Sequence, residues 1–231
     1  MLTHSEKVRT ARVAGVALLL GIIIGIIAAM TVSAGIDINL SADVEATARA
    51  MLNAETRLHG KAYVALLLIG LQLLFLFAAY RLLRDAGPLL AGWSVGVGLV
   101  SIALGLFGVV AAMNAAELAG TVAYQTLASG EQRLLLAGLQ ATTDYTSFHL
   151  GLVMSSAANA AIFILFLRSG DLPKIIAGGG VFASLFVVLA LVIRDFIPVM
   201  GNDLVTMAFM VCNLVALVST GLYLSIRGVR A

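Results

Sequence analysis

The sequence predicts an all-α integral membrane protein, a six-helix bundle with amphipathic helices in the connections on the outer side of the membrane. Hydrophobic residues make up 61% of its 231 residues and charged residues only 11%, against about 45–50% apolar and about 25% charged residues in soluble domains. No water-soluble fold of this size hides so much apolar surface. The apolar residues also form long uncharged runs, and helices satisfy every backbone hydrogen bond within lipid.

Six uncharged runs are long enough, at about 19 to 25 residues, to cross about 30 Å of hydrocarbon as helices. We predict the spans at 13–34, 62–80, 89–113, 145–167, 175–193 and 204–226. The first run follows a basic flank but exceeds the roughly 7–15 apolar residues of a signal peptide. We therefore predict a retained first helix, and a single transmembrane domain over residues 1–231.

The basic residues predict that both termini face the cytoplasm. With the N-terminus inside, nine of the 14 basic residues fall on the inner tails and short inner loops, and five on the outer connections. This distribution follows the positive-inside rule. Nine of the 12 acidic residues fall on the outer side.

The two long outer connections contain predicted helices. Apolar residues at helical spacing after Ser41, a candidate N-cap, predict an amphipathic helix on the membrane surface that runs through Leu58. In 114–144 we predict two helical pieces that are split at Ser129 and Gly130. The apolar side of this second stretch consists of Leu134, Leu135 and Leu139.

Proline and asparagine residues mark several predicted helix ends. Pro88 and Pro173 stand at positions where helices start, since the missing N–H has no intrahelical partner there. We expect Pro198 to end the fifth span, and Asn202 with Asp203 to cap the sixth.

Small residues predict close packing of helices. Gly21 and Gly25 are four residues apart in the first span, and Gly92 and Gly96 in the third. Such spacing lets two backbones approach closely. Two interpretations are open, crossings inside the bundle and a homodimer seam.

Four segments follow one another along the chain in an order that is typical of one family. They are ARVAGVALLLGIIIGI, NAETRLHGKAYVALLL, AAYRLLRDAGPLLAGW and FHLGLVMSSAANAAIFILFLRSGDLPKIIAGG. The most telling pieces are YRLLR at 80–84 and RSGDLP at 168–173. Over nearly the whole chain this pattern resembles the bacterial domain-of-unknown-function 4386 family. The resemblance implies a multi-pass bacterial membrane protein with no established biochemical role, and it transfers no functional residue. We expect the protein in the bacterial cytoplasmic membrane.

One group of candidate site residues lies near the predicted outer surface. It comprises Glu55, His59, Glu117, Asp144 and His149. Glu55 and His59 are four residues apart on the predicted surface helix, so they share a face. Imidazoles and carboxylates together bind Zn²⁺ or exchange protons, so a metalloenzyme at the outer face is one hypothesis. The other interpretation is that these residues hydrate the interface and cap helix ends.

A second group of candidates consists of polar residues within the spans. Two roles are open for them, lining a solute pathway and forming helix–helix contacts. It comprises Gln72, Asn159, Asn213, His149 and Ser156. Polar side chains in lipid usually bond to neighbouring helices, so packing is the commoner role for such residues. A line of them also suits a small-solute transporter or channel. No Asp, Glu, Lys or Arg occurs in the six spans, whereas ion-coupled pumps rely on such groups.

The remaining features exclude several classes of protein. The basic residues are too scattered for a nucleic-acid-binding surface, and the lone Cys212 forms no intramolecular disulfide. We name no catalytic residue, metal ion or cofactor. The expected partners are the lipid bilayer and either a second copy of the chain or another membrane protein. The sequence therefore favours a non-enzymatic accessory, scaffold or partner-binding protein.

Overall fold

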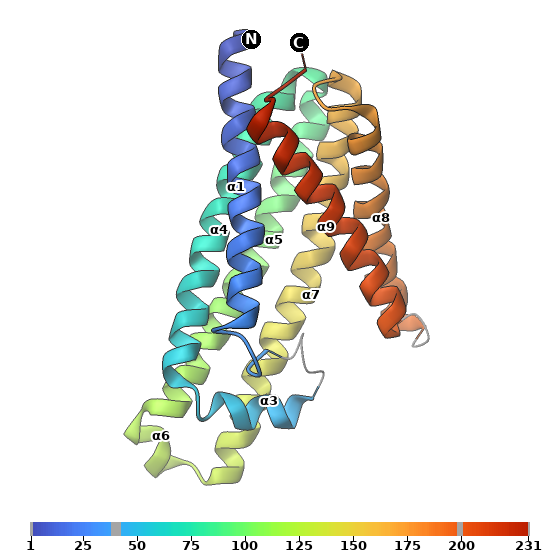
Figure 1. Ribbon diagram of the computed structural model, residues 1–231. Coiled ribbons are helices and arrows are strands. Elements are labelled where there is room, and N and C mark those ends of the chain that lie inside the picture. The colour runs from blue at the N-terminus through green and yellow to red at the C-terminus, as the bar shows by residue number, and fades with distance from the viewer. Residues whose placement is uncertain (1, 38–42, 198–200, 231) are drawn as a thin grey trace. The chain divides into compact units, whose positions relative to one another are not determined.

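The computed structural model describes residues 2–37, 43–197 and 201–230. Its helices are α1 (His4–Met30), α3 (Val44–Met51), α4 (Glu55–Leu83), the short 3₁₀ turn η1 (Arg84–Ala86), α5 (Pro88–Gly120), α6 (Val122–Leu127), α7 (Gly130–Ser169), α8 (Lys174–Phe196) and α9 (Asp203–Ile226) (Figure 1). Within the described ranges, six helices are long and apolar enough to span a membrane. The predicted all-α fold is confirmed, and the chain is a multi-pass membrane protein.

Two helices start with reciprocal hydrogen bonds between side chains and backbone. At α1, the Thr3 N–H donates to Glu6 Oε2 over 2.9 Å and the Glu6 N–H donates to Thr3 Oγ1 over 3.3 Å. At α7, the Ser129 N–H donates to Gln132 Oε1 over 2.9 Å and the Gln132 N–H donates to Ser129 Oγ over 3.3 Å. Each capping box satisfies two donors that have no partner in the helix. The predicted split at Ser129 and Gly130 is confirmed, but a further break at Thr121 gives three helical pieces in 114–144 instead of two.

The other predicted helix starts are also present. Pro88 is the first residue of α5, and Pro173 is the N-cap of α8. Asn202 caps α9 by accepting a hydrogen bond from the Val205 N–H over 2.9 Å. Pro198, the predicted end of the fifth span, lies outside the described residues.

The first span ends earlier than the sequence predicts. α1 ends at Met30, and Gly35 has a φ of 72°, a left-handed conformation that glycine adopts without strain. Arg57 Nη2 donates to the carbonyl oxygens of Thr31 and Ala34. An arginine from another helix therefore satisfies carbonyls just beyond the end of α1, and no local pattern in 13–34 indicates it.

The predicted amphipathic helix exists but is shorter than expected. Asp43 caps α3 by accepting from the Ala46 N–H over 3.0 Å, whereas Ser41 lies outside the described residues. The helix stops at Met51, and Asn53 Nδ2 donates to the Arg49 carbonyl over 3.0 Å. Asparagine competes with helical hydrogen bonds in this way. The prediction that one surface helix runs through Leu58 is therefore wrong, because Leu58 belongs to α4.

Two spanning helices continue well beyond their predicted hydrocarbon segments. α5 has 33 residues and α7 has 40, against the predicted spans 89–113 and 145–167. At 1.5 Å per residue α7 is about 60 Å long, roughly twice the thickness of the hydrocarbon core. The predicted spans include only residues without charge, but a helix that is capped continues past charged residues.

The chain divides into two compact units. Unit 1 comprises Met1–Ile22, Gly70–Ile102 and Gly151–Ala231, and unit 2 comprises Ile23–Ile69 and Ala103–Leu150. α1, α4, α5 and α7 each contribute to both units, because each of these helices is divided between them. The prediction of a single transmembrane domain stays a prediction.

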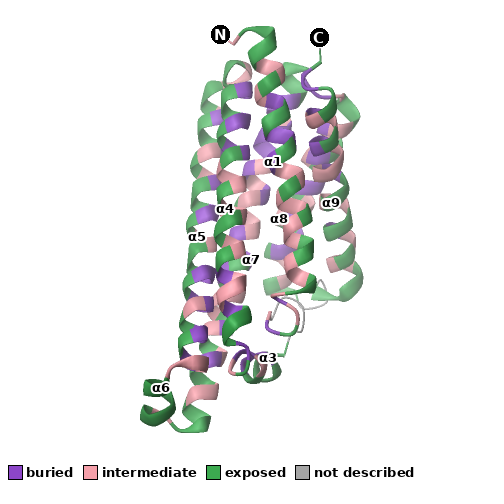
Figure 2. Ribbon diagram, turned by 60° about the vertical axis from the view of Figure 1, so that its left-hand side comes forward, coloured by how far each residue is buried: buried purple, intermediate pink, exposed green. Residues whose placement is uncertain are grey.

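Each unit has buried residues of its own (Figure 2). In unit 1, α8 packs along α9, with Val187, Leu191 and Phe209 in their shared core. In unit 2, Met51 and Leu58 are at most 2% exposed and pack with alanines of α5 and α7. The core of unit 2 thus joins α3 to the spanning helices.

Glycine permits a close helix crossing in unit 1, but not where the sequence predicts one. A Cβ on Gly15 of α1 would lie 2.5 Å from Ser225 N and 2.7 Å from Gly221 O of α9. Only a residue without a side chain fits against these backbone atoms. By contrast, no described atom lies within 4 Å of a Cβ built at Gly21, Gly25, Gly92 or Gly96. The prediction that these four form crossings inside the bundle is therefore wrong, and the homodimer seam stays a prediction.

Candidate functional site

Three charged side chains meet in unit 2. Lys61 Nζ of α4 lies 2.5 Å from Asp144 Oδ2 of α7 and 3.2 Å from Asp37 Oδ2 of the segment after α1. Their side chains are only 12% to 17% exposed. We call Asp37, Lys61 and Asp144 the buried triad. When all three groups are ionised, the buried triad has one negative charge in excess.

A fourth element closes around the buried triad. A Cβ on Gly108 of α5 would lie 2.6 Å from Asp144 Oδ1 and 3.3 Å from Ser147 Oγ. The Asp144 carboxylate therefore occupies the space that a side chain at position 108 would fill. Ser147 Oγ itself donates to the Asp144 carbonyl over 2.9 Å. The absence of a side chain on α5 lets the carboxylate lie against the helix backbone.

The buried triad connects segments that are far apart in the sequence. A buried charge is costly unless it is paired, and removing one partner of a buried ion pair costs about 3–5 kcal/mol. Lys61 is the cation that both carboxylates share. It therefore holds the segment after α1 and the helix α7 against α4.

The sequence identified only part of this site. Asp144 is among the predicted outer-face residues, whereas Lys61 and Asp37 are not. Lys61 and Asp144 share one signal in the sequence, which is their position next to a span. Lys61 directly precedes the predicted span 62–80, and Asp144 directly precedes the predicted span 145–167. A charged residue at the edge of a span usually faces solvent, so this signal by itself does not indicate pairing.

The two acidic candidates at the start of α4 and the end of α5 have different surroundings. Glu55 has its carboxylate against Gly120, where a built Cβ would overlap it. Glu117 Oε2 accepts from Thr121 Oγ1 over 2.5 Å, one helical turn away. Both Glu55 and His59 belong to the spanning helix α4, so the prediction that they lie on a separate surface helix is wrong.

The two histidine candidates have different surroundings. His149 is 9% exposed and stacks on Tyr145, with ring centroids 6.1 Å apart and an interplanar angle of 27°. His59 Nε2 is buried and has no hydrogen-bond partner in the described structure. Within the ranges that the structure describes, no three His, Cys, Asp or Glu side chains gather as metal ligands.

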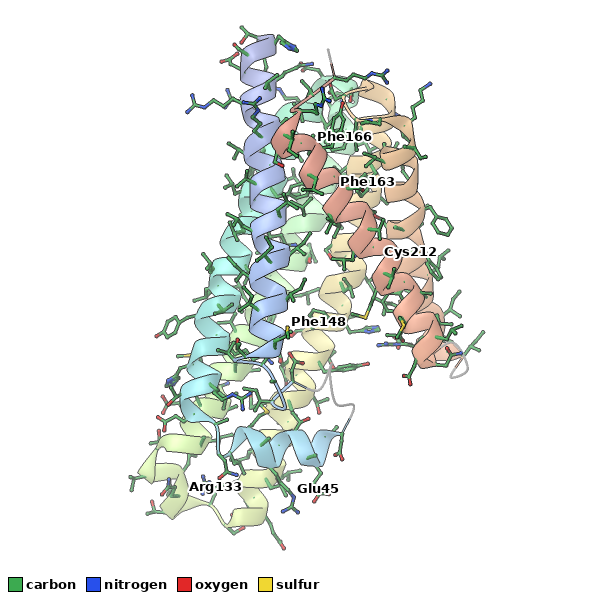
Figure 3. The ribbon with its side chains drawn as sticks, viewed as in Figure 1. Glu45, Arg133, Phe148, Phe163, Phe166 and Cys212 are labelled. Atoms are coloured by element: carbon green, nitrogen blue, oxygen red, sulfur yellow. The ribbon has the colours of Figure 1, made fainter. Side chains whose placement is uncertain are left out.

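Four of the five polar candidates of the spans lie on three helices of unit 1, whereas His149 belongs to unit 2. Gln72 of α4, Asn159 of α7 and Asn213 of α9 are each half-buried, and Ser156 of α7 is 2% exposed. A groove of about 420 Å³ between α8 and α9 is lined by Cys212 (Figure 3) and by mostly apolar side chains, and none of the four polar candidates lines it. A polar pathway through these residues stays a prediction.

A second groove lies in unit 2, where α3 runs across the beginning of α7 (Figure 1). It has a volume of about 620 Å³, and we call it the α3–α7 groove. Its lining residues are Val44, Glu45 and Ala48 of α3 and Glu131, Leu134, Leu135, Gly138, Leu139 and Thr142 of α7. Figure 3 shows Glu45 on α3 and Arg133 near the start of α7.

The α3–α7 groove presents apolar side chains to its surroundings. Leu135 is 75% exposed, Leu139 is 58% exposed and Val44 is 45% exposed. Leu135 and Leu139 are one helical turn apart, so they form a stripe on one face of α7. The predicted apolar side of residues 114–144 is therefore present, and its residues Leu135 and Leu139 are exposed.

Comparison with known proteins identifies the family. The family described as "Domain of unknown function (DUF4386)" matches residues 13–228. Searches among curated proteins and among solved structures found no match. Because the family match covers nearly the whole chain, the resemblance seen in the sequence is confirmed. The chain belongs to the DUF4386 family of membrane proteins.

Proposed function

We propose that this protein is a non-enzymatic scaffold or assembly protein of the bacterial cytoplasmic membrane, with both termini in the cytoplasm. It binds a protein partner through the part of unit 2 that extends beyond the hydrocarbon. The observation that supports this role is the exposed leucine stripe of α7, Leu135 and Leu139, on a segment that the predicted span does not include.

Helix geometry supports a position of this stripe outside the lipid tails. The predicted span begins at Tyr145, so Leu139 and Leu135 lie about 9 and 15 Å beyond its edge at 1.5 Å per residue. Glu131, Gln132 and Arg133 come next in the same helix, and such residues favour water over hydrocarbon. Lipid tails therefore do not cover Leu135, and apolar surface that water would otherwise contact is typical of a protein-binding site.

The part of unit 2 that extends beyond the predicted spans also forms an ordered surface. Gly138 of α7 lies close to α3, since a Cβ built at this glycine would be in van der Waals contact with α3, 3.6 Å from Val44 Cγ1 and 3.9 Å from Ala48 Cβ. Arg133 Nη2 donates to the Leu118 carbonyl over 2.9 Å, which fixes the start of α7 against the end of α5. An ordered surface loses little conformational entropy when a partner binds.

Site-specific crosslinking tests this role. A photoreactive phenylalanine analogue replaces Leu135 in one variant and Leu127 of α6, which is 80% exposed and outside the groove, in the control. After irradiation of cells, we expect a discrete crosslinked species from position 135, and a stoichiometric complex in mild detergent. A monodisperse monomer that forms no crosslink from either position would contradict the proposal.

A further inference from the structure

The charge of the surfaces around the α3–α7 groove indicates the chemistry of its partner. Residues 31–61 and 114–144 contain seven acidic residues and four basic residues. The acidic residues are Asp37, Asp43, Glu45, Glu55, Glu117, Glu131 and Asp144, and the basic residues are Arg49, Arg57, Lys61 and Arg133. These two segments therefore have a net charge of −3, of which the buried triad contributes −1 away from the groove.

Most of the four basic residues have partners away from the groove. Lys61 lies in the buried triad. Arg57 and Arg133 donate to backbone carbonyls. Only Arg49 pairs with a groove residue, Glu45, over 2.6 Å. Two carboxylates line the groove: Glu45 is paired with Arg49, whereas Glu131 forms no ion pair among the described residues.

Glu131 stands at one end of the leucine stripe. Glu131, Leu135 and Leu139 follow at intervals of four residues and line the same groove, so they share one face of α7. Among the described residues no basic side chain forms an ion pair with Glu131. A partner that covers the leucines therefore meets a carboxylate one turn further along.

From this arrangement we infer that the α3–α7 groove binds an amphipathic helix of another protein, with an apolar stripe for Leu135 and Leu139 and a Lys or Arg for Glu131. The inference rests on the proposed partner-binding function and names the partner's chemistry. Helix-in-groove recognition uses such apolar anchors at i and i+4. Opposite charges at the rim steer the correct partner and repel wrong ones.

The same charge disfavours two other occupants. A second copy of the chain that used the same groove would bring its own Glu131 against the first, and like charges oppose such a contact. Anionic lipid headgroups meet the same repulsion. A basic helix is favoured by both the apolar stripe and the carboxylate.

Direct binding of designed peptides tests the inference. The protein is placed in nanodiscs of phosphatidylcholine, a neutral lipid, and empty nanodiscs give the background. One fluorescent 18-residue helical peptide combines a leucine stripe with flanking lysines, and a matched peptide has glutamate at every lysine position. We expect fluorescence anisotropy to show saturable binding of the basic peptide only.

Variants locate the binding. In the Leu135→Ser/Leu139→Ser variant we expect affinity for the basic peptide to fall by about tenfold or more, as for buried anchors of an interface. Glu131→Lys should lower the affinity for the basic peptide and raise it for the acidic peptide. Leu127→Ser on α6 is the matched control, since it removes an equally exposed leucine outside the groove. All variants must keep the far-UV spectrum and elution volume of the parent protein.

Two results would overturn the inference. If the acidic peptide binds as tightly as the basic one, the groove still serves a partner, but the basic chemistry is wrong. If the double serine variant binds the basic peptide as tightly as the parent protein, the groove is not the site. Neither result affects the crosslinking test of the partner-binding function, which uses the natural partner in cells.

Discussion

Lys61 and Asp144 form a buried ion pair, with Nζ and Oδ2 2.5 Å apart, although 83 positions separate them in the chain. Asp37 completes the site 3.2 Å from the same ammonium. The shared position of Lys61 between two carboxylates predicts an order of mutational effects that a single ion pair would not produce.

Replacing Lys61 by methionine should destabilise the protein strongly. Both Asp37 and Asp144 would lose their shared cation while still buried, and loss of one partner of a buried pair costs about 3–5 kcal/mol. Asp144→Asn should cost less, because Lys61 still pairs with Asp37. Chemical unfolding in detergent, followed by circular dichroism, gives the free energy of unfolding for each variant.

The exposed pair of Arg49 and Glu45 is the control for this experiment. Its side chains are 65% and 67% exposed, and exposed pairs contribute less than about 1 kcal/mol. Arg49→Ala should therefore leave the free energy of unfolding nearly unchanged. If Lys61→Met is no more harmful than Arg49→Ala, the buried triad does not stabilise unit 2.

A methyl group at Gly15 should weaken unit 1. The Cβ of Gly15→Ala would stand 2.5 Å from Ser225 N, and overpacking of this kind costs about 1–3 kcal/mol. Gly21→Ala on the same helix is the matched control, because a Cβ there meets no described atom within 4 Å. Alanine favours the helix over glycine by about 1 kcal/mol, so this control should unfold at the same or a slightly higher temperature.

Thermal unfolding of the two alanine variants in one detergent decides this prediction. Equal melting temperatures for Gly15→Ala and Gly21→Ala would mean that α1 and α9 do not cross closely at Gly15.

The thiol of Cys212 should react selectively with uncharged reagents. It is half-buried and lies in a groove whose lining includes Ile175, Phe182, Val211 and Val215. At position 212 of α9, it lies about 14 Å along the helix from Asp203, at 1.5 Å per residue. In membranes, N-ethylmaleimide should label it, and a quaternary ammonium thiosulfonate should not. Rapid labelling by the charged reagent would show that water reaches this groove.

The proposed orientation makes a separate prediction about accessibility. In a Cys212→Ser background, Gln125→Cys on the exposed helix α6 should react with an impermeant maleimide in intact spheroplasts. Ser5→Cys and Arg230→Cys should react only after the membrane is opened. Labelling of position 5 or 230 in intact spheroplasts would contradict the cytoplasmic placement of that terminus.

The sequence by itself determined the six spans, because a long uncharged run has one stable conformation in lipid. Local hydrogen-bonding patterns also predicted the starts of α5, α7, α8 and α9, since Pro88, Ser129, Pro173 and Asn202 act within one helical turn. Resemblance in short motifs sufficed to find the family.

Only the tertiary structure decided which polar residues meet. Lys61 and Asp37 look like ordinary residues at the edges of spans, and Arg57 gives no local sign that it binds the carbonyls after α1. The four glycines at regular spacing, Gly21, Gly25, Gly92 and Gly96, have open space beside them. Gly15, which is not part of that spacing, lies at the crossing with α9. Such contacts depend on how distant segments pack, and a periodic pattern along one helix contains no information about its neighbour.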